Sequence, residues 1–384
     1  MQPHYNPPDF DRPELQGVPD ARFVPAPADG VLPEGFFATT NLPMYVRQDG
    51  RWLMPRFPRM DGAIVRTAEG GFEILEGRYV RAGQDVAVGL AEDGSQGIYV
   101  HATGFIGDVE GDDFAFMRSE VSREKPVDYA LMARLLMNER ERGGHIVWVV
   151  GPAVLHARGR DGIVWFIRNG FMNALLGGNA VGVHDIEQAL LGTTLGMDRS
   201  GRSVSGGHSF HMRAINRIAH AGSIAAAVEQ GILTEGIMHA CVTHHVPFVL
   251  AGSIRDDGPL PDTISDIVRA QEIMRDHAKR TTMAIMVATA LHSIGFGNML
   301  PSYVLEDDGS PRPLTTIAVD TSEFVVNKLK DRGTHQAFGV ITNAQDFLHV
   351  LRHFVEREIA DRAAGPPAAI APAHDGVDLQ RRPA

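Results

Sequence analysis

The sequence predicts an α/β protein in which a parallel sheet forms a cofactor domain and a small β-rich domain precedes it. Two observations predict this fold. Between residues 31 and 120, short apolar runs are separated by Gly and Asp, which is typical of strands joined by turns. From about residue 127, continuous apolar runs alternate with amphipathic helical stretches. Such alternation implies right-handed crossovers between parallel strands.

The chain has 384 residues, more than one domain usually contains, and its composition changes along its length. Residues 1–30 are rich in Pro, Asp and Arg without periodicity, and they predict an extended leader. Residues 31–120 predict the β-rich domain, and residues 121–362 predict the α/β domain. The segment 363–384 is rich in Ala and Pro and predicts a disordered tail.

The elements follow from the local patterns. In the β-rich part, strands are expected at 63–65, 86–88 and 97–100. A first helix is expected at 129–142, where apolar residues recur at helical spacing before two glycines. The later strands are expected at 146–150, the start of 162–176, 180–183, 247–250, 316–319 and 337–341. The later helices are expected at the end of 162–176, 209–229, 262–280, 283–293, 323–330 and 344–362.

Composition excludes several classes of function. The chain carries 36 basic and 47 acidic residues, a formal net charge of −11, whereas a nucleic-acid partner requires a clustered basic surface. No signal-peptide pattern opens the sequence. Its most apolar segments reach only about ten residues, where a membrane span needs roughly 20. We therefore expect a cytoplasmic protein that acts on a small neutral or cationic molecule, with no nucleic-acid or membrane partner.

The single cysteine and the 17 histidines predict no metal site. Cys241 excludes an internal disulfide, and its place before an apolar strand is typical of a small core residue. His208 and His211 could share a helix face, and His244 and His245 are adjacent, but no carboxylate lies at metal-ligand spacing around either pair. The sequence therefore indicates structural or substrate-contacting histidines.

Small and acidic residues follow the predicted strands. Gly151 follows the first strand, Asp185 the strand at 180–183, Gly252 and Ser253 the next, and Asp320 the one after that. Ligands of open α/β sheets bind beyond the carboxyl ends of strands, where an acidic residue can bind ribose hydroxyls, so this pattern predicts a nucleotide site. Ordinary turn chemistry would explain any one of these positions alone. GxGxxG, P-loop and HExxH motifs are absent from the sequence.

The string VPFVLAGSIRDDGPLPD at 246–262 predicts a strand that ends in charged residues. Arg255 could bind a substrate carboxylate, and Asp256 or Asp257 could bind an ammonium group or act as a base. The alternative is a solvated turn with a surface arginine. Asn298, after a helical stretch, is either a substrate contact or a polar helix end.

These strings carry a family resemblance. GNAVGVHDIE (178–187), VPFVLAGSIRDDGPLPD (246–262), LHSIGFGNMLPS (291–302) and VVNKLKDRGTHQAFG (325–339) resemble the archaeal-type ornithine cyclodeaminase family. That family also supplies the C-terminal part of bifunctional arginine dihydrolase/ornithine cyclodeaminase proteins and is related to LOR/SDH conserved proteins. The similarity extends upstream to FFATTNLPMYVRQDGRWLMP (36–55).

The resemblance implies a fold and a reaction. The fold is an NAD-binding domain like that of deoxyhypusine synthase, which needs no GxGxxG, after a β-rich domain. The reaction is the redox-neutral cyclising deamination of ornithine to proline and ammonia by an ammonia-lyase, with tightly bound NAD recycled by hydride removal and return. By analogy with deoxyhypusine synthase relatives, we also expect a homo-oligomer.

Strand-end position and the family-like strings together assign candidate roles. The cofactor contacts are expected to be Gly151, Gly178, Asn179, Asp185, Gly252, Ser253 and Asp320. The catalytic candidates are Arg255, Asp256, Asp257 and Asn298. Further substrate-binding candidates are Arg47, His184, His208 and Lys328. Asp185 and Asp320 would repel a 2′-phosphate, which favours NAD over NADP.

Two other functions stay open at the level of the sequence. The first is an NAD-dependent amino-acid or imine dehydrogenase of the saccharopine type, which would release NADH. The second is a non-catalytic NAD-binding regulatory protein that has the same fold. A transferase like deoxyhypusine synthase is disfavoured, because it needs an active-site lysine and only Lys328 lies near a predicted strand end.

Overall fold

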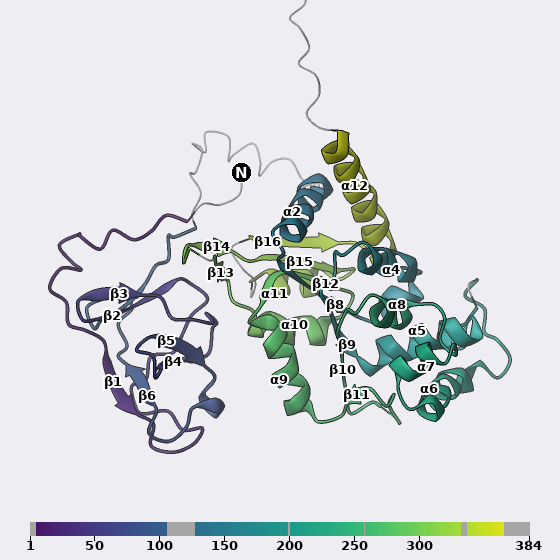
Figure 1. The fold of residues 1–384 in the computed structure, drawn as a ribbon, viewed down its shortest axis with the longest axis horizontal. Coiled ribbons are helices and arrows are strands. Elements are labelled where there is room, and N and C mark those ends of the chain that lie inside the picture. The colour runs from purple at the N-terminus through teal and green to yellow at the C-terminus, as the bar shows by residue number, and fades with distance from the viewer. Residues whose placement is uncertain are drawn as a thin grey trace, which may run out of the picture.

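The computed structural model describes residues 5–105, 127–198, 200–256, 258–306, 308–331 and 336–364. Its centre is a seven-stranded parallel sheet with the strand order β11-β10-β9-β8-β12-β15-β16 (Figure 1). The strands are β8 (His145–Val150), β9 (Ala174–Gly178), β10 (Phe248–Ala251), β11 (Thr263–Ile264), β12 (Thr281–Val287), β15 (Thr315–Asp320) and β16 (Gln336–Ile341). The predicted parallel sheet, preceded by a β-rich region, is confirmed.

The N-terminal region contains two small antiparallel sheets. One has the order β1-β6-β4-β5 and the other β3-β2-β7. Their strands are β1 (Arg22–Pro25), β2 (Met44–Gln48), β3 (Arg51–Leu53), β4 (Ala63–Arg66), β5 (Phe72–Leu75), β6 (Asp85–Val88) and β7 (Ile98–Val100), with a 3-10 turn, η1, at Gly77–Tyr79. Strand β1 lies inside the expected leader and pairs with β6.

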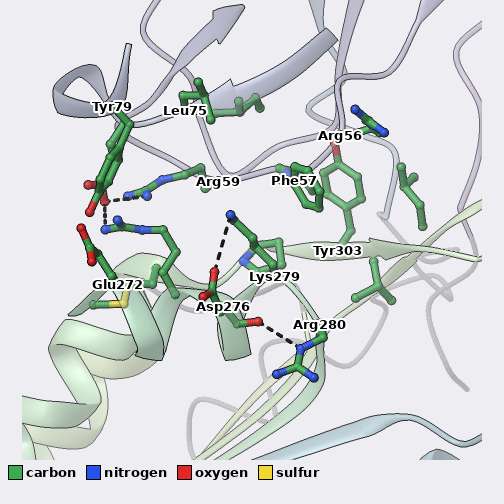
Figure 2. A pocket seen from close by; sticks show the side chains of 18 of the residues that line it. Arg56, Phe57, Arg59, Leu75, Tyr79, Glu272, Asp276, Lys279, Arg280 and Tyr303 are labelled. Atoms are coloured by element: carbon green, nitrogen blue, oxygen red, sulfur yellow. Dashed lines mark hydrogen bonds and ion pairs between the residues drawn. The ribbon is translucent and has the colours of Figure 1, made fainter. Parts of the chain in front are cut away.

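The N-terminal region meets the central α/β unit at helix α9 (Ile267–Ala278). Glu76 forms an ion pair with Arg275 of this helix, and Arg78 donates a hydrogen bond to Gln271. Between the two regions lies a cavity of about 690 Å³, with Phe57 and Arg59 on one wall and Lys279 on the other (Figure 2). The contacts at the junction are therefore polar, and a cavity lies between the two regions.

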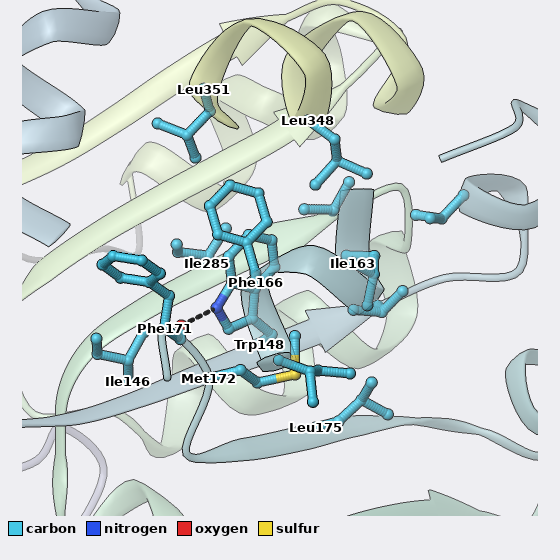
Figure 3. Packing of buried hydrophobic residues seen from close by; sticks show 14 of the residues in the cluster. Ile146, Trp148, Ile163, Phe166, Phe171, Met172, Leu175, Ile285, Leu348 and Leu351 are labelled. Carbon is cyan, nitrogen blue, oxygen red and sulfur yellow. Dashed lines mark hydrogen bonds between the residues drawn. The ribbon is translucent and has the colours of Figure 1, made fainter. Parts of the chain in front are cut away.

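Helices cover both faces of the central sheet. On one face lie α2 (Tyr129–Glu141), α3 (Ala153–His156), α4 (Arg160–Arg168), α8 (Ile237–Thr243) and α12 (Ala344–Ala364), and on the other lie α9, α10 (Ala290–Met299) and α11 (Glu323–Asp331). Strand β8 serves both cores, because successive side chains of a strand point to opposite faces. Trp148 packs against Phe166 on the first face, while Val147 and Val149 pack on the second (Figure 3).

A third apolar cluster extends the protein beyond strand β10. It joins α5 (Asn179–Leu191), α6 (Phe210–Ala221), α7 (Ile224–Glu229) and α8, with a 3-10 turn, η2, at Gly207–Ser209. A short antiparallel hairpin, β13 (Tyr303–Leu305) with β14 (Pro311–Pro313), follows α10. Cys241 is buried in the main core, as predicted for a packing residue.

Several expected elements differ from the observed ones. The expected helix at 283–293 is strand β12 followed by the start of α10, because a strand buried on both faces has no alternating pattern and its Ala and Met residues also suit a helix. The expected strand at 180–183 lies in α5, and the strand-like start of 162–176 belongs to α4.

Two expected helices also begin or end differently. The helix expected at 209–229 is interrupted at Gly222, whose φ of 98° an α-helix cannot contain. Ser223 then caps α7 by accepting a hydrogen bond from the Ala226 amide. The segment 262–280 opens with strand β11, and α9 begins only after the Asp266 cap.

The boundaries expected at residues 120 and 362 need separate mention. The boundary at residue 120 lies outside the described residues. Helix α12 extends past residue 362 to Ala364, the last described residue. The division into four parts therefore stays a proposal. Across the described part of the chain, no helix combines the length and apolar character needed to span a bilayer.

Candidate functional site at the carboxyl ends of the strands

The direction of the chain reverses across the sheet between β8 and β12. From β8 the chain continues outward through β9, β10 and β11, and then returns to place β12 on the other side of β8, followed by β15 and β16. Open parallel sheets bind ligands in the crevice beyond the carboxyl ends of their strands at such a switch point. The topology therefore locates the candidate site where β8 and β12 end.

The two loops at the switch point approach each other closely. The Gly151 amide donates a hydrogen bond of 2.9 Å to the carbonyl of Val287, the last residue of β12. A Cβ atom on Gly151 would overlap the carbonyl oxygen of Ala288, which itself has a φ of 54°. Only glycine fits here because the neighbouring loop approaches its backbone, and the expected contact of Gly151 with a cofactor stays a prediction.

Two long helices begin at this edge of the sheet. Helix α5 follows Gly178 directly, and α10 follows Thr289. No described side chain caps the first amides of either helix. Uncapped amides and the positive end of the helix dipole favour an anion, so either helix start could hold a phosphate group.

His292, in the first turn of α10, points back over the ends of β9 and β10. Its Cε1 and Nε2 atoms lie 2.9 and 3.3 Å from the position that a Cβ on Gly178 would occupy. Its Nδ1 atom lies 3.4 Å from the Thr289 hydroxyl. Burial lowers the pKa of His292, and the negative charge of nearby Asp256 opposes that shift. At neutral pH this pKa favours a neutral imidazole that can accept a proton.

The loop after β10 carries Asp256, the carboxylate whose charge acts on the pKa of His292. Its Oδ2 atom accepts a hydrogen bond of 2.8 Å from the Ser253 amide, and the Ser253 hydroxyl accepts one of 3.0 Å from the Arg255 amide. Arg255 is exposed, and Asp257 lies outside the described residues. The loop is thus a compact turn with one carboxylate held near His292.

The structure brings six of the predicted site residues to one edge. They all end or follow strands of the central sheet: Gly151, Gly178, Gly252, Ser253, Asp256 and Asp320. The Gly252 amide donates to the Ile264 carbonyl, and Asp320 accepts a hydrogen bond of 2.9 Å from the Ser322 amide at the start of α11. These positions form the frame of the candidate site.

Asp185 is not at this edge, contrary to the sequence prediction. It is fully buried in α5 and accepts hydrogen bonds from Arg160 Nε (2.9 Å) and from the amides of Ile237 (2.9 Å) and Met238 (2.8 Å), the first residues of α8. Burial raises the pKa of the Asp185 carboxyl, against the opposing effect of Arg160 and the two amides. This carboxylate caps α8 in the interior and presents no oxygen to a ribose.

Asn179 also has a structural role in this chain. Its Oδ1 atom accepts hydrogen bonds from the Leu260 amide (3.1 Å) and the Thr263 hydroxyl (2.9 Å). The asparagine therefore fixes the loop after β10 relative to the start of α5. Asn179 thereby stabilises the loop that borders the candidate site.

Four other candidates lie away from the switch point. Arg47 is in β2 of the N-terminal region and pairs with Asp20 at 3.0 Å. His208 is exposed in η2, and Lys328 lies over the Phe324 ring in α11. Asn298 is in the last turn of α10, about 12 Å along the axis from its first residue at 1.5 Å per residue.

His184 belongs to a separate cluster in α5. Its Nδ1 atom lies 3.3 Å from Glu187 Oε2, and its ring lies 5.1 Å from that of His156. Glu187 also accepts hydrogen bonds from the Thr193 hydroxyl and the Gly196 amide. The cluster therefore anchors the loop after α5.

His292 and Thr289 are the residues that the sequence reasoning missed. Both follow β12, in the segment 283–293 that the sequence pattern predicts to be one helix. The available signal was Thr289 before a helical stretch, because threonine is common at the N-cap position, which immediately precedes the first turn of a helix. Within the ranges that the structure describes, no three His, Cys, Asp or Glu side chains meet in a metal-binding arrangement.

The parallel sheet with helices on both faces and a switch point between β8 and β12 defines a Rossmann-type α/β protein. Two family models match the chain: residues 43–131 match the first region, and residues 130–351 the Rossmann fold, of the C-terminal part of ArgZ-like arginine dihydrolases. The chain belongs to this ArgZ-like C-terminal family, as the sequence resemblance indicated.

Individual relatives agree. The ornithine cyclodeaminase of Methanopyrus kandleri is 45% identical over 356 residues, covering 90% of this chain and 80% of the relative. A crystal structure of a conserved LOR/SDH protein from Methanococcus maripaludis S2 superposes with a TM-score of 0.80 at 40% identity, covering 89% of this chain and all of the other.

A second solved structure is a complex of the bifunctional relative AgrE with ornithine and NAD⁺. It is 38% identical, with a TM-score of 0.56, and the match covers 91% of this chain and 47% of that one. The bifunctional arginine dihydrolase/ornithine cyclodeaminase AgrE of Nostoc is 40% identical over 345 residues.

Proposed function

We propose that this chain is an NAD-dependent ornithine cyclodeaminase, which converts ornithine to proline and ammonia without net oxidation or reduction. The observation that carries the proposal is the 45% identity to an ornithine cyclodeaminase over nearly the whole chain. The solved complex of AgrE with ornithine and NAD⁺ supports the same pair of ligands. The switch-point crevice is the place where this fold class holds a nucleotide.

Several residues fit an NAD molecule in that crevice. The uncapped starts of α5 and α10 suit its pyrophosphate, and the glycine at Gly151 allows close approach of the backbone. Asp320 ends β15 and is only half-buried, so its carboxylate could accept ribose hydroxyls and would repel a 2′-phosphate. NAD is therefore the cofactor that we propose, in preference to NADP.

NAD in this position would supply a reversible hydride acceptor for the α-carbon of the amino acid. The chain would supply the proton transfers and the binding of the substrate. Neutral His292 would take a proton from a substrate ammonium, and Asp256 beside it would stabilise the imidazolium that results. Arg255, and Asp257 beyond the described residues, stay candidates for the substrate carboxylate and the second amine.

Positioning adds to this chemistry. Once the α-carbon has reached the imine level, attack by the δ-amine of the same molecule closes a five-membered ring, and an oriented intramolecular attack can lower the barrier by several kcal/mol. Ammonia leaves from the α-carbon. The residues at the ends of β9, β10 and β12 would hold the substrate chain in the folded geometry that this attack requires.

The test follows the fate of nitrogen and of the cofactor together. Purified protein is incubated with NAD⁺ and ornithine that carries ¹⁵N at its α-amino group, and proline, ammonia and NADH are measured over time. We expect equal amounts of proline and ammonia, with the label in ammonia and no NADH accumulating in step with product. A matched reaction with His292→Asn protein serves as the control for the site.

The other outcomes favour the other functions. NADH that rises in proportion to product would indicate a dehydrogenase of the saccharopine type. Tight NAD binding with no conversion of ornithine, lysine or related diamines would indicate a regulatory NAD-binding protein. Label retained in proline would contradict loss of the α-amino group.

We further propose that the chain forms a homo-oligomer. Apolar side chains at the carboxyl edge support this: Ile254 after β10 is fully exposed, and Leu291 and Phe324 after β12 and β15 are about three-quarters exposed. Contact with a second copy would remove this apolar surface from water. Light scattering of the wild type and of Phe324→Glu would test it, and a monomeric wild type would contradict it.

A further inference from the structure

The cavity between the N-terminal region and α9 lies at the opposite end of the sheet from the candidate active site. Thr282 in its wall is near the start of β12, whereas the proposed NAD site is at the ends of the strands. With about 690 Å³ it has the size of a small-molecule site. Nothing in the reaction proposed above uses it.

Cations line this cavity from both sides. Arg56 and Arg59 belong to the N-terminal region, and Arg275, Lys279 and Arg280 come from α9 and the segment that follows it (Figure 2). With Arg269 they make six cations among the lining residues, against three carboxylates, in a chain whose formal net charge is −11. The excess of positive charge is therefore local to the cavity, and its sign is opposite to that of the net charge of the whole protein.

The three carboxylates neutralise these cations only in part, and one of them, Glu272, pairs with Arg269 at 3.2 Å. Glu76 alone serves three guanidinium groups, those of Arg59 (2.6 Å), Arg78 (2.8 Å) and Arg275. Asp276 lies 3.8 Å from the Lys279 ammonium, a long ion pair, and its carbonyl oxygen accepts a hydrogen bond from Arg280. Cations gathered in one cavity repel one another unless an anion lies between them.

Buried polar groups of the lining also lack partners. Arg275 is 8% exposed, and its Nε and Nη1 atoms have no hydrogen-bond partner among the described residues. The same holds, within the described chain, for the Thr282 hydroxyl and the Tyr79 hydroxyl. A buried guanidinium that leaves two donors unused is costly, so Arg275 would gain partners by turning toward an oxyanion bound in the cavity.

From these observations we propose that the cavity is a binding site for a small organic or inorganic polyanion, with one oxyanion group near Arg56 and Arg59 and a second near Arg275 and Lys279. Six cations face three carboxylates, so a molecule with two oxyanion groups offsets more of this positive charge than a molecule with one. Phe57, which lies beneath the Lys279 ammonium at 5.4 Å, and Tyr79 add apolar surface for the body of the ligand. Because it joins the two regions, the bound ligand stabilises their junction.

The experiment uses two probes that share this chemistry, citrate and inorganic pyrophosphate. Each is titrated by calorimetry into the full-length protein saturated with NAD, so that pyrophosphate does not compete at the strand ends. We expect at least one probe to bind and to raise the melting temperature. In Arg56→Gln/Lys279→Gln, two largely exposed positions, the affinity should fall about tenfold or more, since each lost charge removes a charge-assisted contact.

The matched control is Arg213→Gln/Arg217→Gln on α6, which removes the same charge from an exposed helix face. This control should bind the probes like the wild type. The relative affinities for citrate and pyrophosphate tell whether the site prefers carboxylates or phosphates, and either result supports the proposal. Binding of neither probe to the wild type, or equal loss in the control, would overturn it.

Discussion

The Gly151 amide donates a 2.9 Å hydrogen bond to the carbonyl of Val287, which joins the loops after β8 and β12 at the point where the sheet changes direction. A side chain on Gly151 would have to displace the backbone carbonyl of Ala288, the residue after Val287. This contact therefore holds together the ends of β8 and β12, where we propose that NAD binds.

We expect Gly151→Ala to force these loops apart and to weaken NAD binding by at least tenfold, with a lower melting temperature. Titration calorimetry with NAD and thermal unfolding would measure both effects. Gly295→Ala is the control, because an added Cβ on Gly295 in α10 meets no described atom within 4 Å. That substitution should keep NAD affinity and leave stability equal or slightly higher, as Ala favours a helix by about 1 kcal/mol over Gly.

His292 and Asp256 together make a prediction about the pH profile. Loss of the proton acceptor in His292→Asn should lower kcat by about 10² or more while NAD affinity changes little. In Asp256→Asn the charge that raises the pKa of His292 is gone, so this pKa falls further. Because the neutral imidazole is the active form, the acidic limb of kcat/KM should move to lower pH.

The control for this pair is Asp361→Asn, an exposed position on α12. Its pH profile should match that of the wild type. An acidic limb that moves to higher pH in Asp256→Asn, or full activity in His292→Asn, would remove His292 from the proton transfer.

The sequence predicted the strand ends to within one residue wherever a strand was correctly recognised. Runs such as 146–150 and 316–319 are continuous and apolar, so Gly151 and Asp320 were placed at the correct edge. Asp185 was misplaced because the string after Gly178 is apolar enough for a strand, although its residues begin α5. A short apolar run cannot be assigned to a strand or a helix by periodicity alone.

The order of the strands could not come from the sequence pattern. Strand β12 lies between β8 and β15 only because the chain crosses back over the sheet, and this crossing depends on packing of both faces. The missed strand also concealed His292, which reaches the site from the helix that follows it. Likewise, the cavity beside α9 joins residues about 200 positions apart, such as Glu76 and Arg275, and no local pattern reports such a contact.

Asp185 provides a test of structural against cofactor-binding roles. In Asp185→Asn the buried Arg160 loses its buried charged partner and keeps only the more exposed Glu235, so we expect the free energy of unfolding to fall by about 3 kcal/mol, measured in urea. NAD affinity of the folded protein should not change. Asp161→Asn on the exposed side of α4 is the control and should be neutral. A large loss of NAD affinity with unchanged stability would contradict the structural role and would indicate that Asp185 contacts the cofactor.

The stacked pair His145 and His277 predicts a pH dependence of stability. Burial, Arg280 and His277 lower the pKa of His145 from 6.5 to about 4 in the folded protein. Between these values the unfolded chain binds more protons, so stability is lost as pH falls from 6.5 toward 4. His145→Asn should make the unfolding free energy less steep in this range, by at most about 1.4 kcal/mol per pH unit. The exposed His349→Asn should leave the slope unchanged.

A substitution of Asp320 tests whether the ribose of NAD lies at the end of β15. In Asp320→Asn the side-chain oxygen can still accept the 2.9 Å hydrogen bond from the Ser322 amide, so the start of α11 stays in place while the charge is removed. If the ribose lies at the end of β15, loss of that charge relieves repulsion of a 2′-phosphate. NADP affinity relative to NAD should then rise about fivefold, which corresponds to roughly 1 kcal/mol. Asp308→Asn, in the exposed β13–β14 turn, should leave the ratio unchanged, and an unchanged ratio in Asp320→Asn would place the ribose at another strand end.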